Sequence, residues 1–307
     1  DGATGSADSA IARRARLGLG IVQRELGDPG HRRALLELAH EAEVAGDDEV
    51  LVAAALENHR GMWSTLATVD DDRLAVLDRA RDRATDPVDR ARLAARTAVE
   101  AVFDPARDVS GLLDEAESLA SGVDDPTVDV EVRLARVTAG WAPATAAGLH
   151  ERSAALVESA RALGDRVAQA HAAMWHALHL RTVGRTAAAR EHLESACAIA
   201  EELDHDGLRL FGAGYRCAQA LLEGDVRAAD AAAEATRQHG ERTGQPDVAA
   251  WYVSMQASIR LLEGRIAELG PLVVAMDEDG TDPLVALGPF QANVAGALLR
   301  AGRTAEG

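Results

Sequence analysis

Lysine is absent from the 307-residue sequence, so all 32 basic residues are arginine. A phosphate-binding loop of the Gly-Lys-Ser/Thr type is therefore excluded from this chain. Aromatic residues are also scarce, at 3% of the sequence against 47% for hydrophobic residues as a whole, so the apolar surface is mostly alanine, leucine and valine. Such side chains suit helices that pack closely together and predict an all-α fold.

Cysteine is equally rare, and no long apolar run or secretory signal interrupts the sequence. The two cysteines, Cys197 and Cys217, show no disulfide-like spacing and stand among alanines, which predicts small packed core residues without a reactive thiolate. We therefore expect a cytoplasmic protein with no membrane contact.

Positive charge is in deficit, with 50 acidic residues against 32 basic ones and a net charge of −18. A surface of this sign repels phosphate groups, and direct nucleic-acid binding by this segment is not expected.

Helix punctuation recurs at a regular interval along the chain. Asp-Pro pairs place a capping carboxylate before a residue that fits the first helical turn, and they stand at 28–29, 86–87, 125–126 and 282–283. Gly184, Gly224, Gly264 and Gly302 each follow an apolar helix, at separations of 40, 40 and 38 residues. A shared period of about 40 residues predicts stacked helix hairpins.

Apolar residues between these marks recur every three or four positions, which indicates antiparallel helix pairs. The predicted first helices are 11–26, 47–59, 87–103, 126–140, 165–183, 206–223, 246–263 and 283–301. The predicted second helices are 30–45, 72–83, 108–121, 147–163, 186–203, 226–243 and 265–277. The expected fold is a right-handed superhelix of tetratricopeptide-like helix pairs.

Four regions follow from this pattern. Residues 1–10 are expected to be a disordered or artificial N-terminal segment, 11–60 to be N-terminal repeats, 61–71 to be an irregular connection, and 72–307 to be the main solenoid. The chain stops where another helix should begin, so we expect part of a longer protein. The apolar face of helix 283–301 would then be left partly uncovered, which favours a partner, a homo-oligomer or a further repeat at that end.

The turn regions resemble those of tetratricopeptide repeats. Leu180 precedes Gly184, and Ala189, Leu193 and Ala196 follow at the large and small packing positions of that family. The period near 40 residues is longer than the usual unit of the family, and Leu269 stands where a small residue is expected.

A second resemblance extends over most of the chain. It rests on residues 58–64 (Asn-His-Arg-Gly-Met-Trp-Ser), 69–73 (Val-Asp-Asp-Asp-Arg), 141–143 (Trp-Ala-Pro) and 261–265 (Leu-Leu-Glu-Gly-Arg). These segments resemble the helical-repeat region of large actinobacterial signalling ATPases, broadly as in MalT-like activators. The resemblance implies a nucleotide-binding switch module before the repeats and a LuxR-type DNA-binding domain or a cyclase domain elsewhere. It implies no catalytic residue and no cofactor within this segment.

Candidate binding residues lie at fixed distances before the turn glycines. In tetratricopeptide-like stacks the first helices line the concave face, and large side chains there can hold a protein, a peptide or a small-molecule effector. The same offsets also fit side chains that simply fill the core between helices, so both alternatives remain open. The residues are His171, Phe211 and Trp251 at thirteen positions before the glycine, and Trp175, Tyr215 and Met255 at nine.

Metal and catalytic sites find less support. His171, His176 and His179 lie on one predicted helix, with Glu191 and His192 on the next. Their spacing does not match a recognised set of metal ligands. The acidic runs at 70–72 and 124–125 stand at helix starts, where capping is the expected role. We predict no metal site and no catalytic residue.

Three functions remain open after these exclusions. The first is a non-catalytic interaction or effector-sensing arm of a larger regulatory protein, and transcription is the process we expect it to regulate. The second is a stand-alone tetratricopeptide-like adaptor or peptide receptor. The third is a helical-repeat enzyme domain with a site assembled from distant residues.

Overall fold

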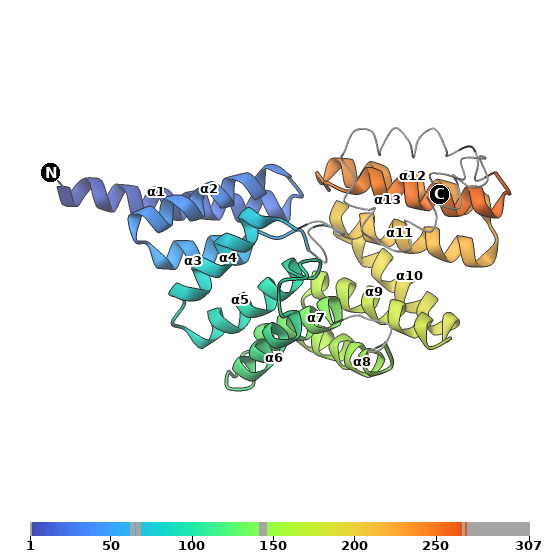
Figure 1. Ribbon diagram of the computed structural model, residues 1–307, viewed down its shortest axis with the longest axis horizontal. Coiled ribbons are helices and arrows are strands. Elements are labelled where there is room, and N and C mark those ends of the chain that lie inside the picture. Colours follow the sequence, from blue (N-terminus) through green and yellow to red (C-terminus); the bar gives the residue numbers. More distant parts are fainter. Residues whose placement is uncertain (1, 62–64, 66–68, 141–145, 266–267, 269–307) are drawn as a thin grey trace. The chain divides into compact units, whose positions relative to one another are not determined.

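The computed structural model describes residues 2–61, 65, 69–140, 146–265 and 268, and these residues form thirteen α-helices and no β-strand (Figure 1). The all-α prediction is confirmed. None of the described helices is long and apolar enough to cross a membrane. The helices are α1 (Gly2–Glu25), α2 (Gly30–Ala45), α3 (Asp48–Glu57), α4 (Asp71–Arg83), α5 (Pro87–Glu100), α6 (Val109–Ala120), α7 (Pro126–Ala139), α8 (Ala146–Leu163), α9 (Arg166–Thr182), α10 (Thr186–Glu202), α11 (Asp206–Glu223), α12 (Val226–Arg242) and α13 (Val248–Leu262).

Aspartate carboxylates begin many of these helices, as the acidic runs predicted. Asp70 accepts a hydrogen bond from the backbone N–H of Arg73 at 3.0 Å, and Asp125 accepts one from Thr127 at 2.8 Å. Each such cap satisfies an orphan donor and contributes about 1 kcal/mol. Further Asp caps begin α3, α5, α6, α9 and α12.

Glycines in the left-handed conformation end the helices at the predicted turns. Gly184, Gly224 and Gly264 have φ of 79°, 75° and 73°, a conformation that side chains with a Cβ rarely adopt. The fourth predicted turn, at Gly302, lies outside the described residues.

The described chain differs from the sequence prediction at its N-terminal end. Helix α1 begins at Gly2, so the expectation of disorder before residue 11 is corrected for residues 2–10. No proline interrupts this stretch, and Ala3, Ala7 and Ala10 allow the helix to extend backward. The predicted helices 265–277 and 283–301 lie outside the described residues except for Arg265 and Glu268.

The predicted irregular connection falls between α3 and α4. Residues 58–61, 65 and 69–70 are non-helical, and the remainder of that connection lies outside the described residues. Its first four residues, 58–61, are called the 58–61 turn below.

The chain divides into two compact units. Unit 1 comprises residues 1–64 and 69–208, and unit 2 comprises residues 65–68 and 209–307. In unit 1 each helix contacts the next one along the chain, from α1 through α10. Helices two apart also contact each other in the pairs α1 and α3, α2 and α4, α3 and α5, α5 and α7, and α7 and α9.

Small apolar side chains fill the cores of both units. In unit 1 a cluster from α2 to α5 includes the fully buried Leu35, Leu77 and Leu93, with alanines between them. In unit 2, Cys217 on α11, Ala233 on α12 and Ile259 on α13 meet in a second core. Alanine at the contacts lets neighbouring helix axes approach closely.

Candidate functional site

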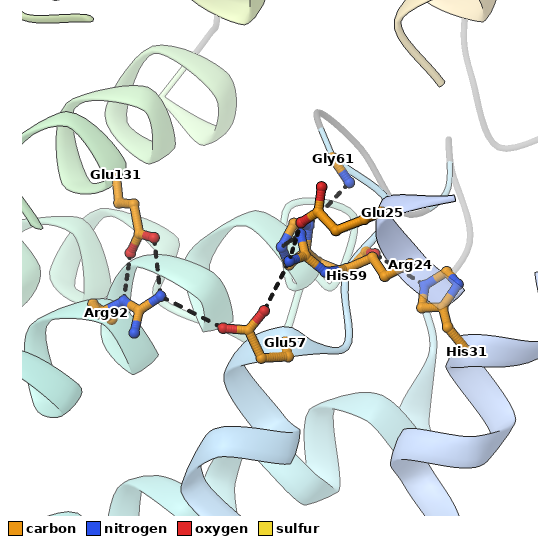
Figure 2. A network of polar contacts seen from close by, with 8 residues as sticks. All are labelled: Arg24, Glu25, His31, Glu57, His59, Gly61, Arg92 and Glu131. Atoms are coloured by element: carbon orange, nitrogen blue, oxygen red, sulfur yellow. Dashed lines mark hydrogen bonds and ion pairs between the residues drawn. The ribbon is translucent and has the colours of Figure 1, made fainter. Parts of the chain in front are cut away.

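The first helices of unit 1 carry a row of alternating charges, which we call the ledge: Arg24 on α1, Glu57 on α3, Arg92 on α5 and Glu131 on α7 (Figure 2). Arg24 Nη2 lies 2.9 Å from Glu57 Oε2, and Arg92 Nη2 lies 3.9 Å from Glu57 Oε1. Arg92 also donates two hydrogen bonds to Glu131, from Nε at 2.6 Å and from Nη2 at 3.0 Å. Four successive first helices are therefore joined by one chain of ion pairs.

The four side chains of the ledge are partly buried. Their exposed fractions run from 19% for Arg24 to 28% for Glu131. Burial by itself lowers the pKa of Arg92, but the hydrogen bonds and charge of Glu131, together with the charge of Glu57, outweigh it and raise that pKa. Two-point pairing of a guanidinium with a carboxylate fixes orientation as well as distance, so Arg92 and Glu131 are held in one geometry.

The 58–61 turn packs against the α1 end of the ledge. The Asn58 side-chain amide donates to the Arg32 carbonyl at 3.2 Å, and Arg24 Nη1 lies 2.8 Å from His59 Nε2. A guanidinium can only donate, so His59 Nε2 accepts from Arg24, and Nδ1 faces the backbone N–H of Gly61 at 3.2 Å, so the ring is neutral. Burial, followed by the charges of Arg96 and Arg24, holds the pKa of His59 well below its usual value, in agreement with that assignment.

His171, one of the predicted groove residues, meets the 58–61 turn from α9. A Cβ built on Gly61, whose φ is 92°, would lie 3.5 Å from the His171 ring. His171 is 7% exposed, and burial, with smaller contributions from His205 and Arg96, lowers its pKa to about 3. The structure therefore places His171 beside the ledge as a neutral imidazole.

The other predicted groove residues lie mainly inside the units. Trp175 is fully buried, and Phe211 and Trp251 are 5% and 8% exposed with their rings 5.5 Å apart. Trp251 Nε1 donates to Asp247 Oδ2 at 3.1 Å. Tyr215 and Met255 are half-buried. This burial fits the alternative in which the side chains fill the core between helices, and their role in binding stays a prediction.

The histidines of α8, α9 and α10 gather into a separate cluster in unit 1. The His176 ring stacks on His150 at 5.4 Å and meets His192 edge-on at 4.7 Å, and Ser153 Oγ lies 2.9 Å from His176 Nδ1. Among the described residues, no three His, Cys, Asp or Glu side chains are placed to hold a metal ion. The cluster is held by ring contacts and one hydrogen bond.

Both cysteines are buried free thiols. Burial, and to a smaller extent the charge of Asp230, raises the pKa of the Cys217 thiol to about 11. Cys217 is therefore a thiol and not a thiolate near neutral pH, as expected of a packed core residue.

Sequence reasoning missed Arg24, Glu57, Arg92 and Glu131 because they do not follow a constant offset. Consecutive members are 33, 35 and 39 residues apart, by subtraction of their numbers, so no single period aligns them. Their one shared sequence signal is that each is a charged residue on a predicted first helix.

The chain matches no model of a known protein family, and no curated protein matches it.

Proposed function

We propose that this chain is a non-catalytic interaction or effector-sensing arm, and that its partner lies along the ledge. The fold we propose is the right-handed superhelix of tetratricopeptide-like pairs, with the first helices on the concave face. Contacts among the described helices of unit 1 support this. First helices touch in an unbroken series from α1 to α9, whereas among second helices only α2 and α4 make a comparable contact. Tight packing in one row and looser packing in the other curves a stack toward the tighter row.

The ledge is the observation that carries the proposal. A concave row of pre-paired charges offers donors and acceptors whose orientation is already fixed, so a partner loses little entropy in ordering them. Arg92 and Glu131 supply that fixed geometry near the middle of unit 1. The partner is a protein, a peptide or a small-molecule effector, and the net charge of −18 argues against direct nucleic-acid binding.

A larger regulator is the setting that we propose for this arm, in which binding biases the switch state of a signalling or transcriptional protein of LuxR type in the cytoplasm. Its support is the sequence resemblance given above and the two buried free thiols, which suit a reducing compartment. Contacts through exposed helical ends would allow a homo-oligomer.

The coding sequence on either side of this segment tests the setting. We expect a phosphate-binding loop before the repeats and a DNA-binding helix-turn-helix or a cyclase after them, and the absence of all three would overturn the regulator proposal.

A peptide-display selection on the purified chain tests the binding surface. We expect recovered peptides to lose about tenfold or more in affinity on Arg92→Ala or Glu131→Ala, because either change leaves a partly buried charge without its partner and releases the fixed geometry. Arg237→Ala is the matched control, since Arg237 forms a partly buried ion pair with Glu234 on α12 of unit 2, outside the ledge. Equal binding to all three variants would show that the ledge is not the binding face.

A further inference from the structure

Arg96 stands one helical turn after Arg92 on α5 and faces a small hollow next to the ledge. The hollow has a volume of about 40 Å³, and its polar wall includes Arg92, Arg96, Glu131 and Thr138. Its apolar wall is made by Ala95, Val99, Leu134 and Ala135. Arg96 is half-buried, and within the described part of the chain it makes neither a hydrogen bond nor an ion pair. The five N–H donors of its guanidinium are therefore open to a ligand or to water.

Four arginines on or near the ledge and the 58–61 turn have carboxylate partners. The pairs are Arg24 with Glu57, Arg32 with Asp70, Arg73 with Glu100, and Arg92 with Glu131. Even so, buried donors remain without an acceptor at Arg24 Nε, Arg32 Nη1 and Arg73 Nη2. With Arg96 included, arginines outnumber their carboxylate partners in this region, and several N–H donors have no acceptor, although the net charge of the chain is −18.

The electrostatic environment of Arg96 points to the same imbalance. Burial lowers the pKa of Arg96, and the charges of Glu131 and Glu100 offset only part of that effect. An arginine nevertheless stays charged at neutral pH. Glu131, an acid in the wall of the hollow, accepts two hydrogen bonds from Arg92 and none from Arg96.

We propose that the hollow at Arg96 binds one carboxylate group. The carboxylate accepts hydrogen bonds from the free N–H donors of Arg96 and contacts Thr138 in the wall of the hollow. The hollow is small, with a volume of about 40 Å³, which suits a group of the size of a carboxylate. The planar fork of arginine matches the two oxygens of a carboxylate. The inference rests on the proposed function: the carboxylate belongs to the C-terminus or an acidic side chain of a peptide lying on the ledge, or to a free small acid.

NMR titration of the arginine Nε–H signals with sodium acetate tests the site directly in the intact chain. The Arg96 signal, assigned by its loss in Arg96→Lys, should shift and saturate at millimolar acetate, as one charge-assisted pair predicts. A tetra-alanine peptide with a free C-terminal carboxylate is the second probe, and the same peptide with a C-terminal amide is its control. Tighter binding of the free-acid peptide than of acetate identifies a peptide source, and equal binding identifies a small acid.

Two variants on the same helix complete the test. Arg96→Gln removes the charge with a good helix former and should weaken binding of the probes by about tenfold or more. Arg90→Gln changes an exposed arginine of α5 and should leave it unchanged. No saturable shift at Arg96 with either probe, or unchanged binding in Arg96→Gln with an unchanged melting temperature, would overturn the proposal. Display peptides that need Arg92 but ignore Arg96 would overturn only this inference and leave the proposed function standing.

Discussion

The guanidinium of Arg73 is completely buried beside the Glu100 carboxylate, with Nε 3.5 Å from Oε1. Arg73 also donates to the Ala55 carbonyl, so α4 is joined to both α3 and α5. Removing one member of a buried pair leaves the other charge desolvated, and this costs more than the pair itself contributes. We predict that Arg73→Met lowers the free energy of unfolding by about 3–5 kcal/mol, as measured by urea denaturation.

The double variant Arg73→Met/Glu100→Met distinguishes a charge effect from lost packing. We expect it to be less destabilised than the sum of its two single changes, because neither charge then remains buried. Arg133→Met is the control, since Arg133 and Asp129 form an exposed pair and its loss should cost less than about 1 kcal/mol. Additive single effects would contradict a coupled pair.

Residues that act locally could be read from the sequence, and those that act across helices could not. Asp70 and Asp125 cap the helices that directly follow them, so three or four residues are enough to predict their role. The Arg92 and Glu131 contact depends on how α5 and α7 rotate about their axes, which no local pattern specifies. The free donors of Arg96 can be recognised only after every neighbouring arginine has been paired.

Helices α8, α9 and α10 meet at the histidine cluster, which makes their packing sensitive to acid. Burial lowers the pKa of both His176 and His179 to about 4. The next largest contribution comes from His192 at His176 and from His150 at His179. Between pH 6.5 and 4 the unfolded chain therefore binds more protons than the folded chain, and stability falls as the pH falls. The charge of Arg185 lowers the pKa of His176 further, and that of Arg161 lowers the pKa of His192. Glu158 and Glu191 raise the pKa of His192 and so oppose this effect.

His176→Gln should reduce this acid sensitivity, because glutamine is polar, does not titrate and has high helix propensity. Melting temperatures measured from pH 7 to pH 4.5 should fall less steeply in this variant than in the wild-type chain. His40→Gln, a change at an exposed position of α2, should keep the wild-type slope. If His176→Gln and His40→Gln gave the same slope as the wild type, the cluster would not control the acid response.

Element boundaries were the most predictable feature of the fold, for reasons visible in α5 and α9. Helix α5 begins at Pro87 after the Asp86 cap, and α9 begins after Asp165 and ends two residues before Gly184. Both signals are local and strong. The start of α1 was placed too late because no cap or proline marks it, and helix propensity alone sets no boundary.

The described helices of unit 1 contact neighbours one or two along the chain, and each unit has its own core. Leu93 is fully buried in a cluster drawn from α2 to α5, whereas Ile259 is fully buried in a cluster drawn from α11, α12 and α13. In a repeat array, the fold that we propose, stability is a sum of local terms and nearest-neighbour terms, so damage should stay near its source.

Hydrogen exchange on two cavity variants tests how far damage spreads. Leu93→Ala and Ile259→Ala each remove a fully buried side chain, at a cost of about 2–5 kcal/mol to the packing around it. We expect Leu93→Ala to speed amide exchange in α2 to α5 while α12 and α13 keep their protection, and Ile259→Ala to do the reverse. Each variant is the matched control of the other, because both truncate a buried β- or γ-branched side chain to alanine. If either change raised exchange equally in both sets of helices, the chain would unfold as one cooperative body and the local-sum description would be wrong.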